Sequence, residues 1–357
     1  MIWNNAGKVN CVRYMKNLDI SKIKKVYDIL EDSKSEYIFE NRLLFSLTHD
    51  YKYIRNVACT VDVVDEIYKE LKSTSESIGI FGAGDVGRHL VKTYDDIAFK
   101  CFIDNKKAGT VYEGIPVISL RDFMNKYPEA YIVISTKLYY EDIYSQLIES
   151  GISSEKIINL GKHYAELNHK QYFDLPQIKE KMLSKEIFVD GGSYDGNSAI
   201  DFSNWLLAPE AGYVYAWEPD YTNIEKCKKL FEKSNLKYEL IPKGLWNVSD
   251  ILKFRLEGTA SSISKEGDVE VEVDCIDNVI SSEVTFIKMD IEGAEYNALL
   301  GASNTIKKYK PKLAICVYHK PEDIWEIPLL IHELNPEYQL YLRHYSFADN
   351  ETVLYAI

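Results

Sequence analysis

Residues Phe188 to Gly196 read Phe-Val-Asp-Gly-Gly-Ser-Tyr-Asp-Gly, and this stretch decides the fold of the second half of the chain. An apolar run that ends in Asp and breaks into glycines is typical of a strand that turns tightly into a helix. Glycines let the backbone bend and let a ligand approach closely, and the amides at a helix N-terminus then face the ligand's acceptor atoms. The stretch predicts a cofactor site, although turns of this kind also occur without a ligand.

Two further strands end in acidic residues. Tyr213 to Trp217 predicts a strand that ends in Glu218, and the distance from Asp190 suits one helix and two turns. In a βαβ unit, an acid about 20 residues beyond the glycine turn accepts the ribose hydroxyls of a nucleoside. Val284 to Met289 predicts another strand, which runs into Asp290. Three carboxylates are therefore expected at one edge of a doubly wound sheet, where such sheets bind ligands.

These segments resemble the FkbM-type methyltransferases, which use S-adenosylmethionine and commonly methylate hydroxyls of sugars or natural products. The resemblance covers roughly Ile187 to Ile357. It implies a class-I methyltransferase sheet whose last strand inserts antiparallel between the fifth and the sixth. The motifs that carry it are the Asp-x-Gly-x-x-x-Gly turn of Asp190, Gly192 and Gly196, the pair Glu218-Pro219, and the segment Ile287 to Glu295.

The resemblance also implies a cofactor-binding set. S-adenosylmethionine carries a sulfonium cation and no phosphate, so a carboxylate-rich pocket attracts it where it would repel a dinucleotide. In this reading Glu218 binds the ribose and the segment around Gly244 flanks the adenine. The residues expected at the cofactor are Asp190, Gly191, Gly192, Ser193, Gly196, Glu218, Pro219, Gly244, Leu245 and Asp290.

Methyl transfer to a hydroxyl also needs a group that removes the acceptor's proton. Leu313 to Tyr318 predicts the fifth strand, so His319 is expected beside Asp290, where the two could form an oriented base. We favour His319 as the base, ahead of His344, and take Asp290 and Glu292 as the other catalytic residues. Two alternatives stay open. The two acids could cap the following helix, or they could hold a divalent ion with His319, although carboxylates at strand ends need no metal and we predict none.

The first half of the chain has its own glycine turn. Ser77 to Phe81 predicts a strand, and Gly82, Gly84 and Gly87 then form a complete Gly-x-Gly-x-x-Gly fingerprint ahead of helical spacing. Asp104, at the end of the next predicted strand, stands where the ribose-binding acid of a dinucleotide site belongs. The pattern predicts a small Rossmann-like domain with a second nucleotide site.

The ligand of this first domain is less constrained. Segments 102–105 and 114–117 resemble the Rossmann-like N-terminal domains of bacterial sugar acyltransferases, which implies a nucleotide or nucleotide-sugar. A structural or dimerising domain, and hence a homodimer, stays open. An active dehydrogenase is disfavoured because no Tyr-Lys or Cys-His set lies between Gly87 and Gly161.

The predicted fold class is α/β, with two doubly wound domains and a helical N-terminal segment. We assign a helical segment to residues 1–75, the Rossmann-like domain to 76–161, a helical connector to 162–186 and the methyltransferase domain to 187–357. Within the last, the alternation Val269, Val271, Val273 predicts a strand paired antiparallel with Ile251 to Leu256. The stretch between them, Gly258 to Gly267, could close over the cofactor or be a plain surface loop.

Composition excludes several classes of partner. There are 55 Asp and Glu against 42 Lys and Arg, a formal net charge of -13, so nucleic acid is not an expected substrate. The six cysteines are far apart and show no metal-binding spacing, which favours a reducing cytoplasm. No apolar run approaches the roughly 20 residues of a membrane span.

Together these observations predict an S-adenosylmethionine-dependent O-methyltransferase. Its expected acceptor is a hydroxyl of a sugar or glycan precursor, in surface polysaccharide or natural-product biosynthesis. The alternative is a non-catalytic nucleotide-sugar-binding or scaffolding protein in which one or both glycine turns persist without chemistry.

Overall fold

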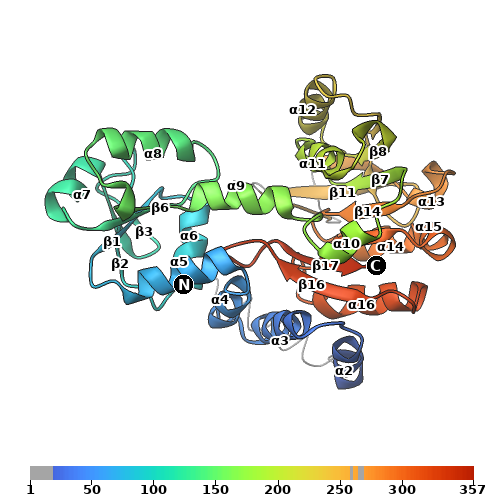
Figure 1. Ribbon diagram of the computed structural model, residues 1–357, viewed down its shortest axis with the longest axis horizontal. Coiled ribbons are helices and arrows are strands. Elements are labelled where there is room, and N and C mark those ends of the chain that lie inside the picture. The colour runs from blue at the N-terminus through green and yellow to red at the C-terminus, as the bar shows by residue number, and fades with distance from the viewer. Residues whose placement is uncertain (1–18, 258–259, 264–268) are drawn as a thin grey trace. The chain divides into compact units, whose positions relative to one another are not determined.

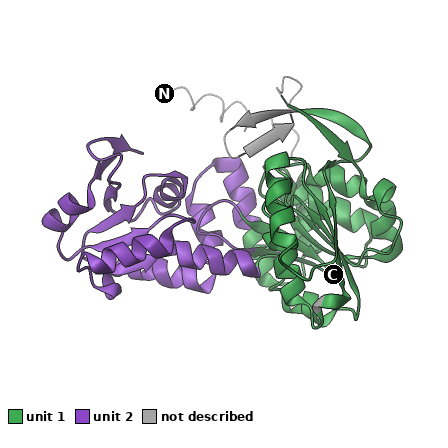
Figure 2. Ribbon diagram, turned by 90° about the horizontal axis from the view of Figure 1, so that it is seen from above, with its two compact units in different colours: residues 1–39, 171–343, 351–357 green, residues 40–170, 344–350 purple. Residues whose placement is uncertain are grey.

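A computed structural model describes residues 19–257, 260–263 and 269–357 (Figure 1). The chain forms two compact units, and neither is continuous in sequence (Figure 2). Unit 1 takes the chain up to Phe39, then Gln171–Arg343 and Glu351–Ile357, and unit 2 takes Glu40–Lys170 and His344–Asn350. The domains predicted from the sequence are continuous segments, whereas each of these units combines segments that are far apart in the chain.

Unit 1 is built on a seven-stranded sheet of order β16-β17-β15-β14-β7-β8-β9. The neighbours from β9 to β15 run parallel, and β17 lies antiparallel to β15, between β15 and β16. The predicted class-I sheet with its antiparallel last strand is confirmed. The strands are β7 (Glu186–Gly191), β8 (Gly212–Trp217), β9 (Tyr238–Ile241), β14 (Phe286–Met289), β15 (Lys312–Cys316), β16 (Leu340–His344) and β17 (Thr352–Ala356).

The register of this sheet aligns the strand ends on which the site depends. Asp190 lies opposite Lys288, and Gly191 lies opposite both Met289 and Trp217. The chain therefore leaves β7, β8 and β14 at the same edge. This alignment brings the glycine turn, Glu218 and the segment after Met289 together, because each follows its strand directly.

Aromatic side chains fill the core beneath this edge. The ring of Phe188 on β7 stacks on Phe202 with centroids 4.6 Å apart, and it meets Phe286 of β14 edge to face at 5.3 Å. All three are fully buried. Burying such rings contributes about 1.5 to 3 kcal/mol each, which keeps the strand ends in register.

Helices of unit 1 connect the strands. α16 is largely apolar, and it packs against α2, α14 and α15. The helices are α2 (Ile20–Asp28), α10 (Pro176–Glu180), α11 (Asn197–Trp205), α12 (Tyr221–Phe231), α13 (Ile276–Val279), α14 (Glu295–Leu300), α15 (Ser303–Tyr309), α16 (Asp323–Leu334) and the 3-10 turn η2 (Pro209–Ala211). α3 (Ser33–Thr48) begins in unit 1 and ends in unit 2.

A second, four-stranded sheet of unit 1 has the order β10-β13-β11-β12. Its strands are β10 (Gly244–Leu245), β11 (Asp250–Glu257), β12 (Ala260–Ile263) and β13 (Val269–Asp274). β11 and β13 pair antiparallel, as their alternation predicts. The stretch expected to be a loop contains β12, and the rest of it, 258–259 and 264–268, lies outside the described residues.

Unit 2 contains a six-stranded sheet of order β3-β4-β2-β1-β5-β6, parallel except for the pair β3 and β4. The predicted Rossmann-like arrangement is therefore present. The strands are β1 (Ile78–Phe81), β2 (Phe99–Ile103), β3 (Val111–Tyr112), β4 (Ile115–Ile118), β5 (Tyr131–Ile134) and β6 (Ile157–Asn159). The helices are α4 (Lys52–Ala58), α5 (Asp62–Ser73), α6 (Asp85–Thr93), α7 (Leu120–Lys126), α8 (Tyr140–Glu149), α9 (Leu160–Lys170) and the 3-10 turn η1 (Ser154–Lys156).

The short segment 344–350, between β16 and β17, belongs to unit 2 because its side chains are anchored there. The ring of Phe347 lies 5.1 Å from that of Tyr164, and Arg42 donates a hydrogen bond to the carbonyl of Asp349. Within the described part of the chain, no helix has both the length and the apolar character that crossing a bilayer requires.

Candidate active site

The glycine turn after β7 adopts a conformation that only glycine tolerates at two positions. Gly192 has φ 75°, and a Cβ on it would lie 2.0 Å from the carbonyl oxygen of Asp290. Gly196 has φ 87°, and a Cβ there would lie 2.8 Å from the ring of Phe231. The turn is thus pressed directly against the residue that follows β14. The two halves of the predicted site adjoin.

Asp190 supports this turn through an ion pair and a hydrogen bond. Its carboxylate is fully buried, Oδ1 lies 3.0 Å from Nζ of Lys288, and Oδ2 accepts a 2.6 Å hydrogen bond from Ser198. Lys288 also donates to the carbonyls of Gly191, at 3.1 Å, and Gly192, at 2.8 Å. Burial works against the charge on Lys288, yet the neighbouring Asp190 carboxylate raises the pKa of the amine overall. The ion pair of Asp190 and Lys288 therefore holds the backbone of Gly191 and Gly192 in place, next to the expected cofactor site.

Glu218 ties the end of β8 to the same turn. Its Oε2 accepts a 2.9 Å hydrogen bond from the amide of Tyr194, and its Oε1 accepts one of 2.8 Å from the amide of Asp220. The side chain is almost wholly buried, and burial raises its pKa. Pro219 directly follows Glu218. Within the glycine turn, the hydroxyl of Ser193 donates a 3.1 Å hydrogen bond to the carbonyl of Asp190.

The second sheet brings Leu245 to the turn. A Cβ on Gly191 would lie 2.7 Å from Cδ1 of Leu245, and one on Gly244 would lie 3.1 Å from Val273. The segment expected to flank the adenine therefore lies beside the glycine turn.

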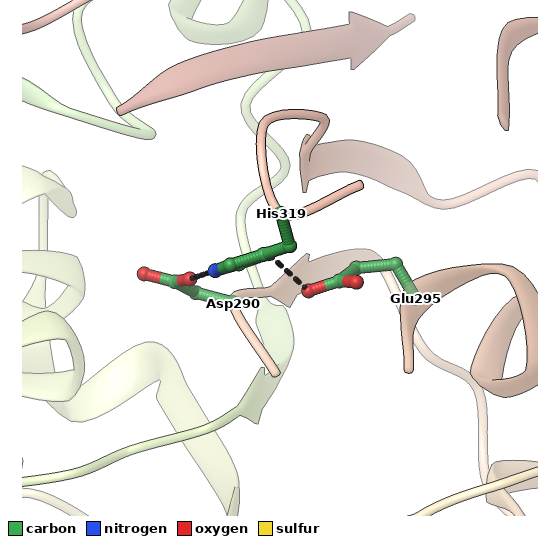
Figure 3. Close-up of side chains that lie close together, drawn as sticks. All are labelled: Asp290, Glu295 and His319. Carbon is green, nitrogen blue, oxygen red and sulfur yellow. Dashed lines mark ion pairs between the residues drawn. The ribbon is translucent and has the colours of Figure 1, made fainter. Parts of the chain in front are cut away.

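A cluster of ionisable side chains occupies the segment after β14. Nε2 of His319 lies 3.3 Å from Oδ1 of Asp290 and 3.7 Å from Oε2 of Glu292. On the opposite side of the ring, Nδ1 lies 3.0 Å from Oε1 of Glu295 (Figure 3). Glu292 has φ 54° and a half-exposed side chain, whereas Glu295 is fully buried. The imidazole thus lies between carboxylates on both sides.

Two tyrosines complete the surroundings of Asp290. Tyr172, from the connection between α9 and α10, donates a 3.0 Å hydrogen bond to Oδ2, and Tyr318, just after β15, donates one of 3.2 Å to Oδ1. Burial opposes ionisation of Asp290, but the hydrogen bond and charge of His319 outweigh it and lower the pKa. The ionised form of Asp290 is therefore favoured, and both of its carboxylate oxygens already have partners in Tyr172, Tyr318 and His319.

The same contacts determine the charge of His319. Burial disfavours the imidazolium, but the charge of Glu295 and the contact with Asp290 more than compensate, and the pKa of His319 is raised well above its ordinary value. Burial also raises the pKa of Glu292. The surroundings of His319 therefore favour its protonated form.

Asp290, Glu295 and His319 lie close enough together to be considered as metal ligands. However, a metal binds one imidazole nitrogen, and here each carboxylate faces a different nitrogen (Figure 3). One ion cannot take all three without rearrangement of the ring. The alternative set of Asp290, Glu292 and His319 would have to use Nε2 and would displace its proton.

Comparison with known proteins identifies this half of the chain. Residues 190–348 match the model of the methyltransferase FkbM domain. The C-terminal half carries an FkbM methyltransferase domain. The domain uses S-adenosylmethionine, as the resemblance in the sequence implied.

One solved structure agrees with this chain at the level of the fold, and two others are similar over a smaller share of it. Methyltransferase FkbM from Methylobacillus flagellatus KT is 18% identical and superposes with a TM-score of 0.52 over 91% of this chain and 99% of its own. A putative rRNA methylase from Clostridium thermocellum is 15% identical over 51% of this chain and 93% of its own, with a TM-score of 0.36. A SAM-dependent methyltransferase from Aquifex aeolicus is 14% identical over 54% of this chain and 97% of its own, with a TM-score of 0.32. No curated protein is significantly similar in sequence.

The residues of the FkbM methyltransferase domain fit the cofactor's chemistry. Glu218, Asp290 and Glu292 make the edge beside the glycine turn acidic. A sulfonium cation without phosphates suits such an edge. When bound, S-adenosylmethionine would supply the electrophilic methyl group, and Glu218 is the residue expected at its ribose.

The structure brings together the catalytic residues expected from the sequence, His319, Asp290 and Glu292. His344 belongs to unit 2, where burial lowers its pKa to about 3. The sequence analysis missed three contributors, Glu295, Tyr172 and Lys288. Glu295 is the last residue of the FkbM motif given above, but the sequence analysis treated it only as part of a helix. No sequence pattern indicates that Tyr172 contacts Asp290.

The glycine turn of unit 2 also has tight geometry. Gly82 has φ 110°, and a Cβ on Gly87 would lie 2.7 Å from the carbonyl oxygen of Gly82. A Cβ on Gly84 would face open space. Oδ1 of Asp104 accepts hydrogen bonds from the amides of Lys106, at 2.9 Å, and Lys107, at 3.1 Å. The carboxylate thus caps its own turn.

Residues 74–158 match the model described as C2185-like, N-terminal. That match places a defined domain in the first half of the chain and names no ligand for it. Binding of a nucleotide or nucleotide-sugar at the turn of unit 2, and a homodimer through this domain, stay predictions.

Proposed function

We propose that this protein transfers the methyl group of S-adenosylmethionine to a hydroxyl of a sugar or glycan precursor, in surface polysaccharide or natural-product biosynthesis. The observation that carries the proposal is the contact between Gly192 and the carbonyl of Asp290, which joins the cofactor turn to the cluster around His319. A methyl donor at the turn and a hydroxyl at the cluster would meet at this edge. In-line displacement needs such alignment.

In this proposal the chain's own residues align the reactants and handle one proton. Gly192 and Gly196 let the cofactor approach the backbone, and Glu218 receives the ribose hydroxyls. Nε2 of His319 takes the proton of the acceptor hydroxyl, and Asp290 stabilises the imidazolium that results. Glu292, half exposed beside the same nitrogen, orients the acceptor.

His319 has to lose its resting proton before it can accept another. A like charge close to an imidazolium lowers its pKa, so the sulfonium of the bound cofactor would favour this loss. Once that positive charge was gone, Asp290, Glu292 and Glu295 would again favour the imidazolium. The electrostatics of the cluster thus match the charge changes of the reaction.

The proposal for unit 2 is that it holds a nucleotide-activated sugar at Gly82 to Gly87 and so recruits the acceptor. We place the reaction in the cytoplasm, because Cys101 and Cys316 are buried free thiols and the cysteines form no disulfide among the described residues. The alternative, a binding or scaffolding protein without catalysis, differs in one measurable respect: it would show no turnover.

Calorimetric titration with S-adenosylmethionine tests the first step. The intact protein is expected to bind, and Glu218→Ala and Asp190→Ala should abolish binding. Because Asp190→Ala also leaves Lys288 buried without its partner, Asp190→Asn serves as the milder variant. If the intact protein fails to bind the cofactor, the methyltransferase proposal is lost.

A second experiment tests the chemistry. Methyl transfer from labelled cofactor is measured on a panel of nucleotide-sugars, glycans and small-molecule alcohols and amines. His319→Ala should keep cofactor affinity and lose turnover by about 100-fold or more, the usual contribution of a positioned base. Undiminished turnover in this variant would exclude His319 as the base, and labelled amines in place of alcohols would contradict O-methylation.

A further inference from the structure

Glu295 is a buried carboxylate with an uncommon set of partners. It stands in the first turn of α14 and is fully buried. Oε1 accepts a 2.8 Å hydrogen bond from the amide of Ile291 and lies 3.0 Å from Nδ1 of His319. Oε2 is buried too, and among the described residues neither it nor Nδ1 of His319 has a partner in hydrogen-bond geometry, so Nδ1 and Oε1 face each other as an ion pair. The carboxylate therefore depends on His319 for a cation.

The neighbours of His319 leave Glu295 as its partner on the Nδ1 side. Asp290 and Glu292 both approach Nε2. Asp323, at the start of α16, is buried, and its pKa is raised to about 7 by burial and the charge of Glu295. The titratable groups that interact with the ring are Asp290 and Glu292 after β14, Glu295 of α14, Tyr318 after β15, and Asp323 at the start of α16.

The two nitrogens of an imidazole diverge, so fixing one directs the other. With Nδ1 held by Glu295, Nε2 faces the half-exposed Glu292 and the edge next to Gly192. Without that contact, the ring could rotate by half a turn and exchange its nitrogens. Tautomer and orientation of a catalytic histidine are commonly set by such a partner.

We propose that Glu295 is the positioning residue of this site: it accepts the Nδ1 proton of His319 and so fixes the ring with Nε2 toward the acceptor. Its importance for turnover rests on the proposed function, whereas its effect on the ring of His319 does not. A purely structural role, as a helix N-terminal acceptor for the amide of Ile291, predicts no effect on that ring.

The variants separate orientation from charge. Glu295→Gln keeps an oxygen for Nδ1–H and for the amide of Ile291 but removes the charge, and Glu295→Ala removes both. Glu186→Gln is the matched control, because Glu186 is equally buried in unit 1 but pairs with Lys312 at 2.8 Å. It should lower stability without reaching His319.

The primary readout is the ring of His319 itself, followed by nitrogen NMR on protein labelled in its seven histidines and assigned with His319→Asn. The wild type should hold the imidazolium through neutral pH. Glu295→Gln should move the titration midpoint down by about one to three pH units, the usual effect of removing a close opposite charge. An unchanged midpoint, or an equal change in Glu186→Gln, would overturn the proposal.

A measurement on the unmodified protein guards against a variant that does not fold. In the wild type without cofactor, the Nδ1 proton of His319 should exchange slowly and give a resonance typical of a charge-assisted hydrogen bond, while the Nε2 proton exchanges faster. The reverse order would contradict the assignment of Nδ1 to Glu295.

Turnover supplies the last readout. In Glu295→Gln the acidic limb of the pH–rate profile should move to lower pH with reduced kcat and near-normal KM for the cofactor, and in Glu295→Ala kcat should fall further. If the NMR results hold while no methyl transfer is found, the proposed function fails and the role of Glu295 toward His319 stands. If turnover is found but the profile does not move, the positioning role fails alone.

Discussion

At the scale of single residues, the site depends on one hydrogen atom at Gly192, where a methyl group would lie 2.0 Å from a backbone oxygen. We expect Gly192→Ala to lose more stability than the roughly 1 to 2 kcal/mol that a left-handed backbone alone costs a non-glycine residue. It should also weaken cofactor binding, since Asp290 must move. Chemical denaturation and calorimetry measure the two effects.

Gly109→Ala is the control for Gly192→Ala, because Gly109 has φ 86° but faces open space. It should show only the backbone cost and normal cofactor binding. Equal losses in the two variants would contradict the steric argument.

His319 should give unit 1 a pH-dependent stability. Its folded pKa is raised above the ordinary value of about 6.5, so the stabilisation is complete below pH 6.5 and is lost as the pH rises through the folded pKa. The free energy of unfolding should therefore fall as the pH rises above about 6.5, and the fall is followed below the range where tyrosines titrate. His319→Gln should flatten this dependence, and an identical slope in the variant would show that other groups cause it.

At the scale of elements, the pair of Lys288 and Asp190 joins β14 to β7 at the height of the glycine turn. Lys288→Met would leave a fully buried carboxylate without its cation, and we expect a loss of about 3 to 5 kcal/mol. In Asp190→Asn with Lys288→Met no charge remains to be buried, so much of that loss should be recovered. A double-mutant cycle by denaturation measures the coupling, and additive losses would show that the pair is not coupled.

The elements of unit 1 could be predicted where chain-local chemistry determines them. Apolar runs such as Phe286 to Met289 predict strands, and an acid after each run predicts the edge where they meet. The antiparallel insertion of β17 followed only from the resemblance to FkbM methyltransferases. Tyr172 shows the limit, since its contact with Asp290 joins residues 118 positions apart and leaves no periodic trace in the sequence.

Side-chain roles within a predicted element were harder still. Glu295 looks like any acid in a first helical turn, where it complements the helix dipole. Only the structure shows that the carboxylate of Glu295, besides accepting from the amide of Ile291, contacts the imidazole of His319 rather than water. In the same way, segment 344–350 continues a strand in sequence but is anchored in unit 2, which removed His344 from the candidate bases.

At the scale of the whole molecule, the two glycine turns raise the question of which unit binds the cofactor. The fuller dinucleotide fingerprint, Gly82 to Gly87, stands in unit 2, and its acid Asp104, like Glu218 in unit 1, accepts two backbone amides. The looser turn in unit 1 stands beside the ionisable cluster. The chemistry around each turn, rather than the match to a consensus, argues that S-adenosylmethionine binds unit 1.

Crossed variants test this assignment. Gly87→Val would place a side chain into a space where even a Cβ lies 2.7 Å from the carbonyl of Gly82, so unit 2 should unfold at lower temperature while calorimetry still shows normal affinity for S-adenosylmethionine. Glu218→Gln should do the opposite: the thermal unfolding of unit 2 should stay as in the wild type, while cofactor affinity falls by about tenfold or more, since a hydrogen bond to a charged group contributes about 1.5 to 3 kcal/mol. If Gly87→Val abolished cofactor binding and Glu218→Gln did not, the cofactor would belong to unit 2, and the acidic edge around His319 would need another ligand.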